Sequence, residues 1–169
     1  AMLVQNTNPA VVAPETTKVL KGLSRDDLFF CVHEQFMTDT ALYADILLPA
    51  TTFVEHNDIY QAGGHQHIIL GPRLIEPVGQ SHSNHQVICD LANRLGANHR
   101  GFKMTEEEII DDTLKTSGWG DIDKLRNNNW IDCQPSFEAS HFLNGFPNKD
   151  GKFRFSPDWS TQGPNHSEL

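Results

Sequence analysis

The sequence contains none of the short motifs that commonly mark a nucleotide, metal or hydrolase site. It has no G-x-G-x-x-G turn and no G-x-x-x-x-G-K-[ST] loop, so neither a standard dinucleotide fingerprint nor a P-loop is predicted. It has no C-x-x-C pair for zinc or an iron–sulfur cluster, and no G-x-S-x-G elbow. Any ligand site must therefore be built in another way.

Cysteine, positive charge and long apolar runs are all scarce. Cys31, Cys89 and Cys133 are odd in number and far apart, so we expect three reduced thiols. Thirteen Lys and Arg against 22 Asp and Glu give a charge of −9, which disfavours binding to nucleic acid or to an anionic membrane. No apolar run approaches the roughly 20 residues of a membrane-spanning helix, and no signal-like segment opens the chain. We expect a soluble, cytoplasmic protein.

What the sequence does contain is enough apolar material for one folded domain. The chain has 169 residues, of which 38% are hydrophobic and 21% charged, as in ordinary globular proteins. This length suits one sizeable core better than two. We predict an α/β domain over residues 1–116 and an irregular extension over residues 117–169.

The first fifty residues alternate between apolar runs and short helical segments. Strands are predicted at residues 2–4, 28–32 and 46–48, and helical turns at residues 14–23 and 38–44. The apolar runs are continuous, which is typical of strands covered on both faces by helices. The pattern predicts a short parallel sheet flanked by helices, which is a Rossmann-like α/β fold.

The remaining chain has weaker signals. Residues 51–80 are polar and contain Gly and Pro, so we expect a long loop with one short strand. Amphipathic helices are predicted at residues 84–95 and from Thr105, which opens a capping-box spacing. A hairpin is expected to turn at residues 148–151. The last residues, 161–169, are expected to fray.

Polar or turn-forming residues follow each predicted strand of the parallel sheet. They occur at residues 6–9, 33–35 and 49–52, and the carboxyl ends of parallel strands share one edge. Asn and Glu side chains there can bind a purine or a ribose, while Thr hydroxyls and helix-start amides suit phosphates. The alternative is that these residues only cap strands and helices.

Nine histidines raise the question of a metal site. His65/His67 and His82/His85 have spacings that can place two rings on one face of a strand or helix. Neither pair has a third ligand at a recognisable motif spacing. We therefore predict that this chain provides no metal ligand.

A small hydrolase is a further alternative. Glu55, His56 and Asp58 form a cluster of acid and base groups. Adjacent residues on an extended segment point apart, and the chain has no nucleophile motif to accompany them. We expect this cluster to serve loop packing.

One long stretch resembles a known family. Residues 32–41 and 44–56 are similar to the hallmark of the bis-molybdopterin guanine dinucleotide oxidoreductases, the dimethyl sulfoxide reductase superfamily. Three further stretches agree in order: residues 6–14, 83–96 and the FP…GK segment at 146–155. The resemblance thus covers nearly the whole chain.

The resemblance implies that the chain is a later part of the catalytic subunit, mostly its third, Rossmann-like domain, which grips one pterin guanine dinucleotide. Relatives often have Asp where Glu34 stands, and a hydroxyl residue at Val12 or Ala50, so the hydrogen bonds here would differ. The cofactor contacts carried over by position are Thr7, Asn8, Pro9, Val12, His33, Glu34 and Ala50.

The resemblance also implies what lies outside this chain. The parent enzyme would hold bis-molybdopterin guanine dinucleotide with Mo or W, while no cysteine here falls at the metal-ligand position and no residue here is expected to be catalytic. We expect the fragment to be inactive alone, to retain little or no cofactor, and to contact the missing domains of the parent chain. Its exposed apolar surface would promote a homodimer. The alternative is a stand-alone, non-catalytic nucleotide-binding or interaction module.

Overall fold

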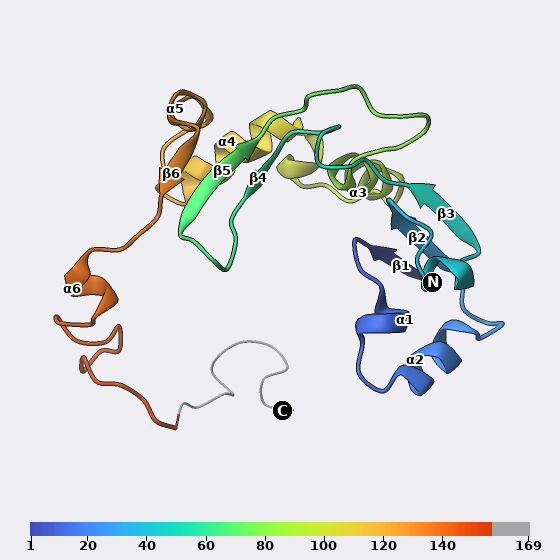
Figure 1. Cartoon of the computed structure of the whole chain (residues 1–169), viewed down its shortest axis with the longest axis horizontal. Coiled ribbons are helices and arrows are strands. Elements are labelled where there is room, and N and C mark those ends of the chain that lie inside the picture. Colours follow the sequence, from blue (N-terminus) through green and yellow to red (C-terminus); the bar gives the residue numbers. More distant parts are fainter. Residues whose placement is uncertain (157–169) are drawn as a thin grey trace. The chain divides into compact units, whose positions relative to one another are not determined.

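The three strands predicted near the N-terminus form a parallel sheet in a computed structural model that describes residues 1–156. The strands are β1 (Met2–Gln5), β2 (Phe30–Glu34) and β3 (Ile46–Pro49), ordered β1-β2-β3 and parallel throughout. Figure 1 shows them with short helices between them. The predicted α/β fold class, a short parallel sheet flanked by helices, is confirmed.

Two details of these strands differ from the prediction. β2 begins at Phe30 and continues through Glu34, so His33 and Glu34 are strand residues because their backbone groups still pair with neighbouring strands. The expectation that β3 is buried was wrong, since Ile46 and Leu47 are 43% and 45% exposed. β3 has a full strand partner on one side only, which leaves its side chains open.

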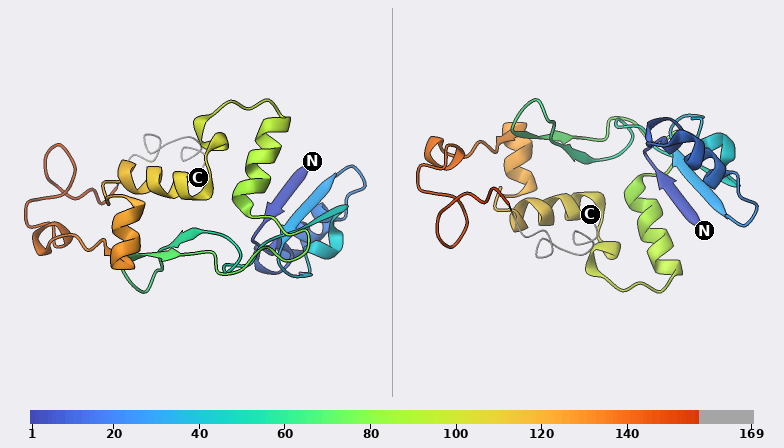
Figure 2. Two further views of the ribbon diagram at one scale, coloured as in Figure 1. Left: turned by 90° about the horizontal axis from the view of Figure 1, so that it is seen from above. Right: turned by 90° about the horizontal axis from the view of Figure 1, so that it is seen from below.

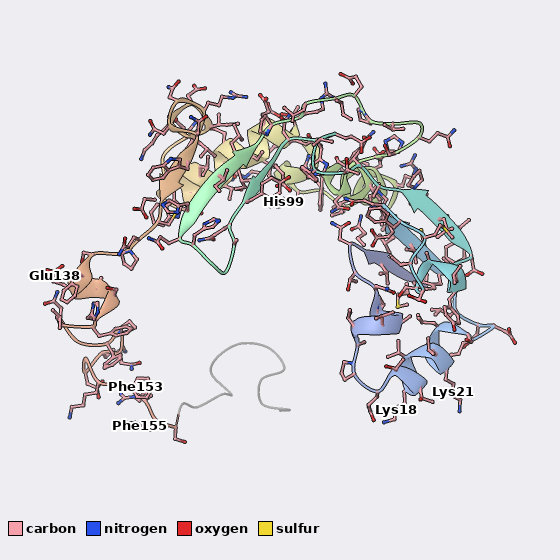
Figure 3. The ribbon with its side chains drawn as sticks, in the orientation of Figure 1. Lys18, Lys21, His99, Glu138, Phe153 and Phe155 are labelled. Atoms are coloured by element: carbon pink, nitrogen blue, oxygen red, sulfur yellow. The ribbon has the colours of Figure 1, made fainter. Side chains whose placement is uncertain are left out.

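Short helices cover one face of the parallel sheet. They are α1 (Pro9–Val12), α2 (Thr16–Leu23) and the 3-10 turn η1 (Ala41–Tyr43). α2 begins after Pro14 rather than at it, because Glu15 adopts a left-handed conformation with φ of +55°. Lys18 and Lys21 project outward from α2 (Figure 3). The core below consists of Val4, Ala10, Leu23, Phe30, Val32 and Ala41.

A second, antiparallel sheet was not predicted. It contains β4 (Asp58–Tyr60), β5 (His67–Gly71) and β6 (Trp130–Asp132), in that order. The expected loop with one short strand therefore holds two strands, and the third comes from much later in the chain. Helices α4 (Glu106–Thr116) and α5 (Ile122–Asn128) pack against this sheet (Figure 2). Its core consists of Ile68, Ile110, Leu114, Leu125 and Ile131.

The two longer predicted helices are confirmed. α3 (Asn84–Arg94) ends before Gly96, whose φ of +73° suits glycine after a helix. The 3-10 turn η2 (Arg100–Lys103) leads to α4, where Thr105 and Glu108 form the predicted capping box. No helix within residues 1–156 is long and apolar enough to cross a bilayer.

The chain divides into two compact units, one ending at Cys133 and one beginning at Gln134. The assignment of residues 1–116 and 117–169 to different regions of a longer enzyme stays a prediction. The second unit contains α6 (Phe137–Ser140) and a turn in which the Phe146 amide donates to the Gly151 carbonyl (2.8 Å).

The predicted hairpin is thus only a turn. No strand flanks it among residues 134–156, and aromatic rings contact one another along the segment instead. The rings of Phe146 and Phe153 are tilted, with centroids 5.2 Å apart. The rings of Phe153 and Phe155, both labelled in Figure 3, meet edge to face with centroids 5.0 Å apart. The expected fraying of residues 161–169 lies outside the described residues.

Candidate functional site

The ends of the three parallel strands lie side by side. Gln5 of β1 is level with His33 of β2, and His33 is level with Leu48 of β3. The polar segments that follow these strands therefore start from one edge of the sheet, as predicted. In open parallel sheets this carboxyl edge is where ligands bind.

A fourth segment joins the same edge. Ala50 pairs with His82 in a parallel bridge, in which the His82 amide donates to the Pro49 carbonyl and the Thr51 amide donates to the His82 carbonyl, both at 3.1 Å. Ser83 follows directly and caps α3 by accepting a hydrogen bond from the amide of Gln86 (3.3 Å). The bridge therefore anchors the start of α3 beside the strand ends.

His33 is completely buried at this edge, and both its ring nitrogens have partners. The Gln5 side-chain amide lies 3.0 Å from Nδ1, and the His82 carbonyl oxygen lies 3.0 Å from Nε2. A carbonyl only accepts and an amide NH₂ only donates. With the Gln5 amide nitrogen at Nδ1, these two contacts fit the His33 tautomer that carries its proton on Nε2.

Asn8 connects the first two loops of the edge. Its side-chain oxygen accepts hydrogen bonds from the Thr40 amide (3.1 Å) and the Thr40 hydroxyl (2.7 Å). The Thr40 hydroxyl oxygen also accepts from the amide of Ala10 (3.0 Å), and Thr40 is fully buried. Much of the hydrogen-bonding capacity of Asn8 is therefore used within the protein.

The other predicted contacts differ in accessibility. Thr7 and Val12 are exposed, Pro9 and Glu34 are half-buried, and Ala50 is buried. One oxygen of the Glu34 carboxylate accepts from the amide of the next residue at 2.7 Å, and the Glu34 carbonyl accepts from the Ala50 amide at 3.1 Å. The edge thus offers a carboxylate and a hydroxyl to a ligand.

Several residues of this edge were not predicted. Gln5, Thr40 and His82 complete the network, and the Gln35 side-chain amide donates to the Thr51 carbonyl (2.9 Å). No local pattern identifies His82 as a partner of His33, because 49 residues separate them. Gln5 was detectable, since it is the last residue of an apolar strand at the predicted edge.

A cavity of about 490 Å³ lies beside β3 and the His82 segment. None of the seven predicted contact residues lines it, although their neighbours do. Its lining residues are Leu47, Leu48, Pro49, Gly79, Gln80, Ser81, His82 and Val87.

The acid and base cluster serves loop packing, as expected. The Glu55 carboxylate accepts from the amide (2.6 Å) and hydroxyl (2.8 Å) of Thr52 and from the Val78 amide (2.6 Å). These bonds, those from Thr52 above all, lower the pKa of Glu55. His56 Nδ1 lies 2.8 Å from the hydroxyl oxygen of Thr51, a residue that is only 3% exposed and so unsuited to attack a substrate.

The histidine pairs have other partners. The ring of His67 meets Trp130 edge to face at 4.8 Å, and His85 Nε2 lies 2.8 Å from the Met104 carbonyl oxygen. Within residues 1–156, no group of three or more His, Cys, Asp and Glu side chains is arranged to hold a metal ion. Burial raises the pKa of the Cys31 and Cys89 thiols, which disfavours the thiolate form that binds metals.

The residues that form this edge match a known protein family. The family profile described as molybdopterin oxidoreductase matches residues 1–94, which include all three parallel strands. The chain is 45% identical over 114 residues to the probable oxidoreductase YoaE of Bacillus subtilis (strain 168), covering 68% of this chain and 17% of that protein. It is 29% identical over 156 residues to the dimethyl sulfoxide/trimethylamine N-oxide reductase of Rhodobacter capsulatus, covering 85% of this chain and 17% of that protein.

A solved structure has the same fold over most of the chain. The acetylene hydratase from Pelobacter acetylenicus aligns with a TM-score of 0.61 and 25% sequence identity, over 81% of this chain and 19% of that one. The chain thus spans about a fifth of the length of the relatives that it matches. The family profile covers more than half of the chain, and the chain therefore belongs to the molybdopterin oxidoreductase family.

Proposed function

We propose that this chain is the part of a molybdenum or tungsten oxidoreductase that binds the guanine dinucleotide portion of one pterin cofactor. The observation that carries the proposal is the alignment of three strand ends at one edge, within the residues matched by the family profile. The bis-molybdopterin guanine dinucleotide would carry Mo or W, which exchanges electrons or an oxygen atom with substrate. The chain itself would bind and orient the nucleotide end.

The donors and acceptors at the edge fit a nucleotide. The half-buried carboxylate of Glu34 can accept hydrogen bonds from a purine or a ribose, and the exposed hydroxyl of Thr7 can donate to a phosphate. Pro9 and Val12 offer apolar surface beside them. Asn8 and His33 have internal partners, so we infer that they mainly hold the loops in place.

The redox reaction would belong to the parent enzyme. We propose that the isolated chain is inactive and binds the cofactor weakly, because one side of a cleft supplies only part of the burial and preorganisation on which affinity depends. Metal analysis of the purified chain should find far less than one Mo or W per chain. Stoichiometric molybdopterin would contradict this expectation.

We propose that the missing domains of the parent cover the apolar side chains exposed around the parallel sheet. Phe36 and Met37 are 71% and 67% exposed, and Ile46 and Leu47 on β3 are nearly half exposed. Without those domains such a surface favours a homodimer. Light scattering at increasing concentration should show a dimer, and a monomer throughout would contradict this. Cytoplasmic location stays a prediction.

The direct test is nucleotide binding by the full 169-residue chain. We expect GDP to shift the amide resonances of Thr7, Glu34 and Ala50 with a Kd of about 1 mM, and ADP to bind more weakly. Glu34→Gln should reduce the preference for GDP, because a neutral amide accepts more weakly from the guanine N–H groups. Glu107→Gln on α4, which packs against the antiparallel sheet, is the matched control. Unchanged resonances at the edge with GDP well above that concentration would overturn the proposal.

A further inference from the structure

The buried ring of His33 connects two segments at the proposed nucleotide edge. It lies on β2 between two elements that are far apart in the sequence. Gln5 at the end of β1 donates to Nδ1, and the carbonyl of His82, which precedes α3, accepts from Nε2–H. The ring therefore joins the first strand to the start of α3 across the sheet.

The His82 carbonyl extends this connection to the third strand. It accepts a second hydrogen bond from the Thr51 amide, and the His82 amide donates to Pro49 at the end of β3. The Ala50 amide in turn donates to the carbonyl of Glu34, the residue after His33. The loops that would carry Thr7, Glu34 and Ala50 toward the nucleotide are all connected through this one ring and its partners.

Because the His33 ring is buried, it depends on its two protein partners for hydrogen bonds. His33 is 0% exposed, so water cannot replace either partner of its ring. With the Gln5 amide nitrogen facing Nδ1, the ring tautomer with its proton on Nε2 satisfies both the Gln5 amide and the His82 carbonyl. Alternation along β2 puts His33 on the sheet face opposite to Val32, which packs under α1 and α2. The connection is thus separate from the apolar core.

We propose that His33 is a positioning residue that sets the spacing of the nucleotide-binding loops through its Nε2–H tautomer, without touching the nucleotide through its ring. This inference rests on the proposed function for its effect on binding, but the tautomer and the hydrogen bonds can be tested without any ligand. The His33 ring would thus bond only to other groups of the protein.

The ligand-free test is nitrogen NMR of the full chain. The His33 ring should show the neutral Nε2–H tautomer at pH 7, and the amide of Thr51 should be strongly protected from hydrogen exchange. A ring protonated on Nδ1 at pH 7 would overturn the inference, whatever the nucleotide does.

Three substitutions separate the two bonds of the ring. His33→Gln can keep an N–H donor for the His82 carbonyl, His33→Asn can keep an oxygen acceptor for Gln5, and His33→Leu keeps neither. At a GDP concentration near the wild-type Kd, the Leu variant should reduce occupancy from roughly one half to roughly one tenth, since a tenfold loss of affinity is expected when both bonds are lost. The His33→Gln and His33→Asn variants should each keep a GDP occupancy between those of the Leu variant and the wild type.

The control is His67→Gln on β5, which removes a ring that packs against Trp130 in the antiparallel sheet and should leave GDP occupancy unchanged. If His33→Leu fails to fold, Gln5→Leu removes the Nδ1 bond while keeping the ring, and should weaken GDP binding about threefold. Wild-type binding of GDP in folded variants of either kind would overturn the inference. Failure of the wild-type chain to bind GDP, with the tautomer as expected, would overturn the proposed function alone.

Discussion

The two sheets of the first unit are held together by different kinds of interaction. The antiparallel sheet rests on an apolar core in which Leu114 and Leu125 are 1% and 0% exposed. The parallel sheet has its core on one face, while at its carboxyl edge the buried groups are polar: His33 and Thr40 are both 0% exposed. The antiparallel sheet thus buries apolar side chains, whereas the edge proposed to bind the nucleotide also buries polar ones. Substitutions should therefore affect the two regions independently.

The largest effect is expected from Leu125→Ala in α5. Leu125 is fully buried beside Leu114, and removing a buried leucine side chain costs about 2 to 5 kcal/mol. Chemical denaturation should show the loss, and hydrogen exchange should rise in β5 and β6 well before β2. Equal exchange in β2 and β5 would show that the two sheets unfold as one unit.

Thr40→Val is expected to reduce stability less than Leu125→Ala does, but to disturb the loops at the carboxyl edge of the parallel sheet more. Valine has nearly the same shape, yet it removes the hydroxyl that donates to Asn8 and accepts from the Ala10 amide. Leaving such buried groups unpaired costs about 1 to 3 kcal/mol. The Asn8 and Ala10 resonances should shift and GDP binding should weaken, with β5 unchanged. An unaffected first loop would contradict the role given to Thr40.

The smallest effect on stability at neutral pH is expected at Glu55. This residue lies in the segment between β3 and β4, and its carboxylate accepts hydrogen bonds within that segment and from Val78. Hydrogen bonds from Thr52 and Val78 lower the pKa of Glu55 in the folded chain. The stability that this carboxylate contributes is therefore fully present above the ordinary glutamate pKa of about 4.3 and is lost as the pH falls through the lower folded value. The Glu55 carboxyl carbon should titrate below that ordinary pKa, and the Val78 amide should lose protection only in acid. Titration at or above the ordinary value would contradict this, and Glu55→Gln should abolish the acid step.

The parallel sheet was predictable because the sequence signals for its strands lie within a few neighbouring residues. Each strand is a short apolar run, and a polar or turn-forming segment follows it within a few residues. The β4–β5 pairing was missed because residues 51–80 are mostly polar, and β6 because Trp130–Asp132 is only three residues long and pairs with β5 from far along the chain. Local pattern carries little information about such a pairing.

The same limit applies within the candidate site. The sequence placed Asn8, His33 and Glu34 at the edge, and the strand register puts Gln5 level with His33 and Glu34 level with Pro49. It did not distinguish the half-buried carboxylate of Glu34 from the buried ring of His33, since both simply follow an apolar strand. The distinction required the partners Gln5 and His82, which approach the His33 ring only in the folded chain.

By itself the sequence determined the fold class, the strands of the parallel sheet and the family resemblance, because apolar periodicity and motif order are properties of neighbouring residues. Only the tertiary structure decided which polar groups of the edge are used internally and which remain for a ligand. The physical reason is that a buried donor or acceptor must find a partner, and here the partners of His33 and Asn8 come from segments that folding brings from distant positions.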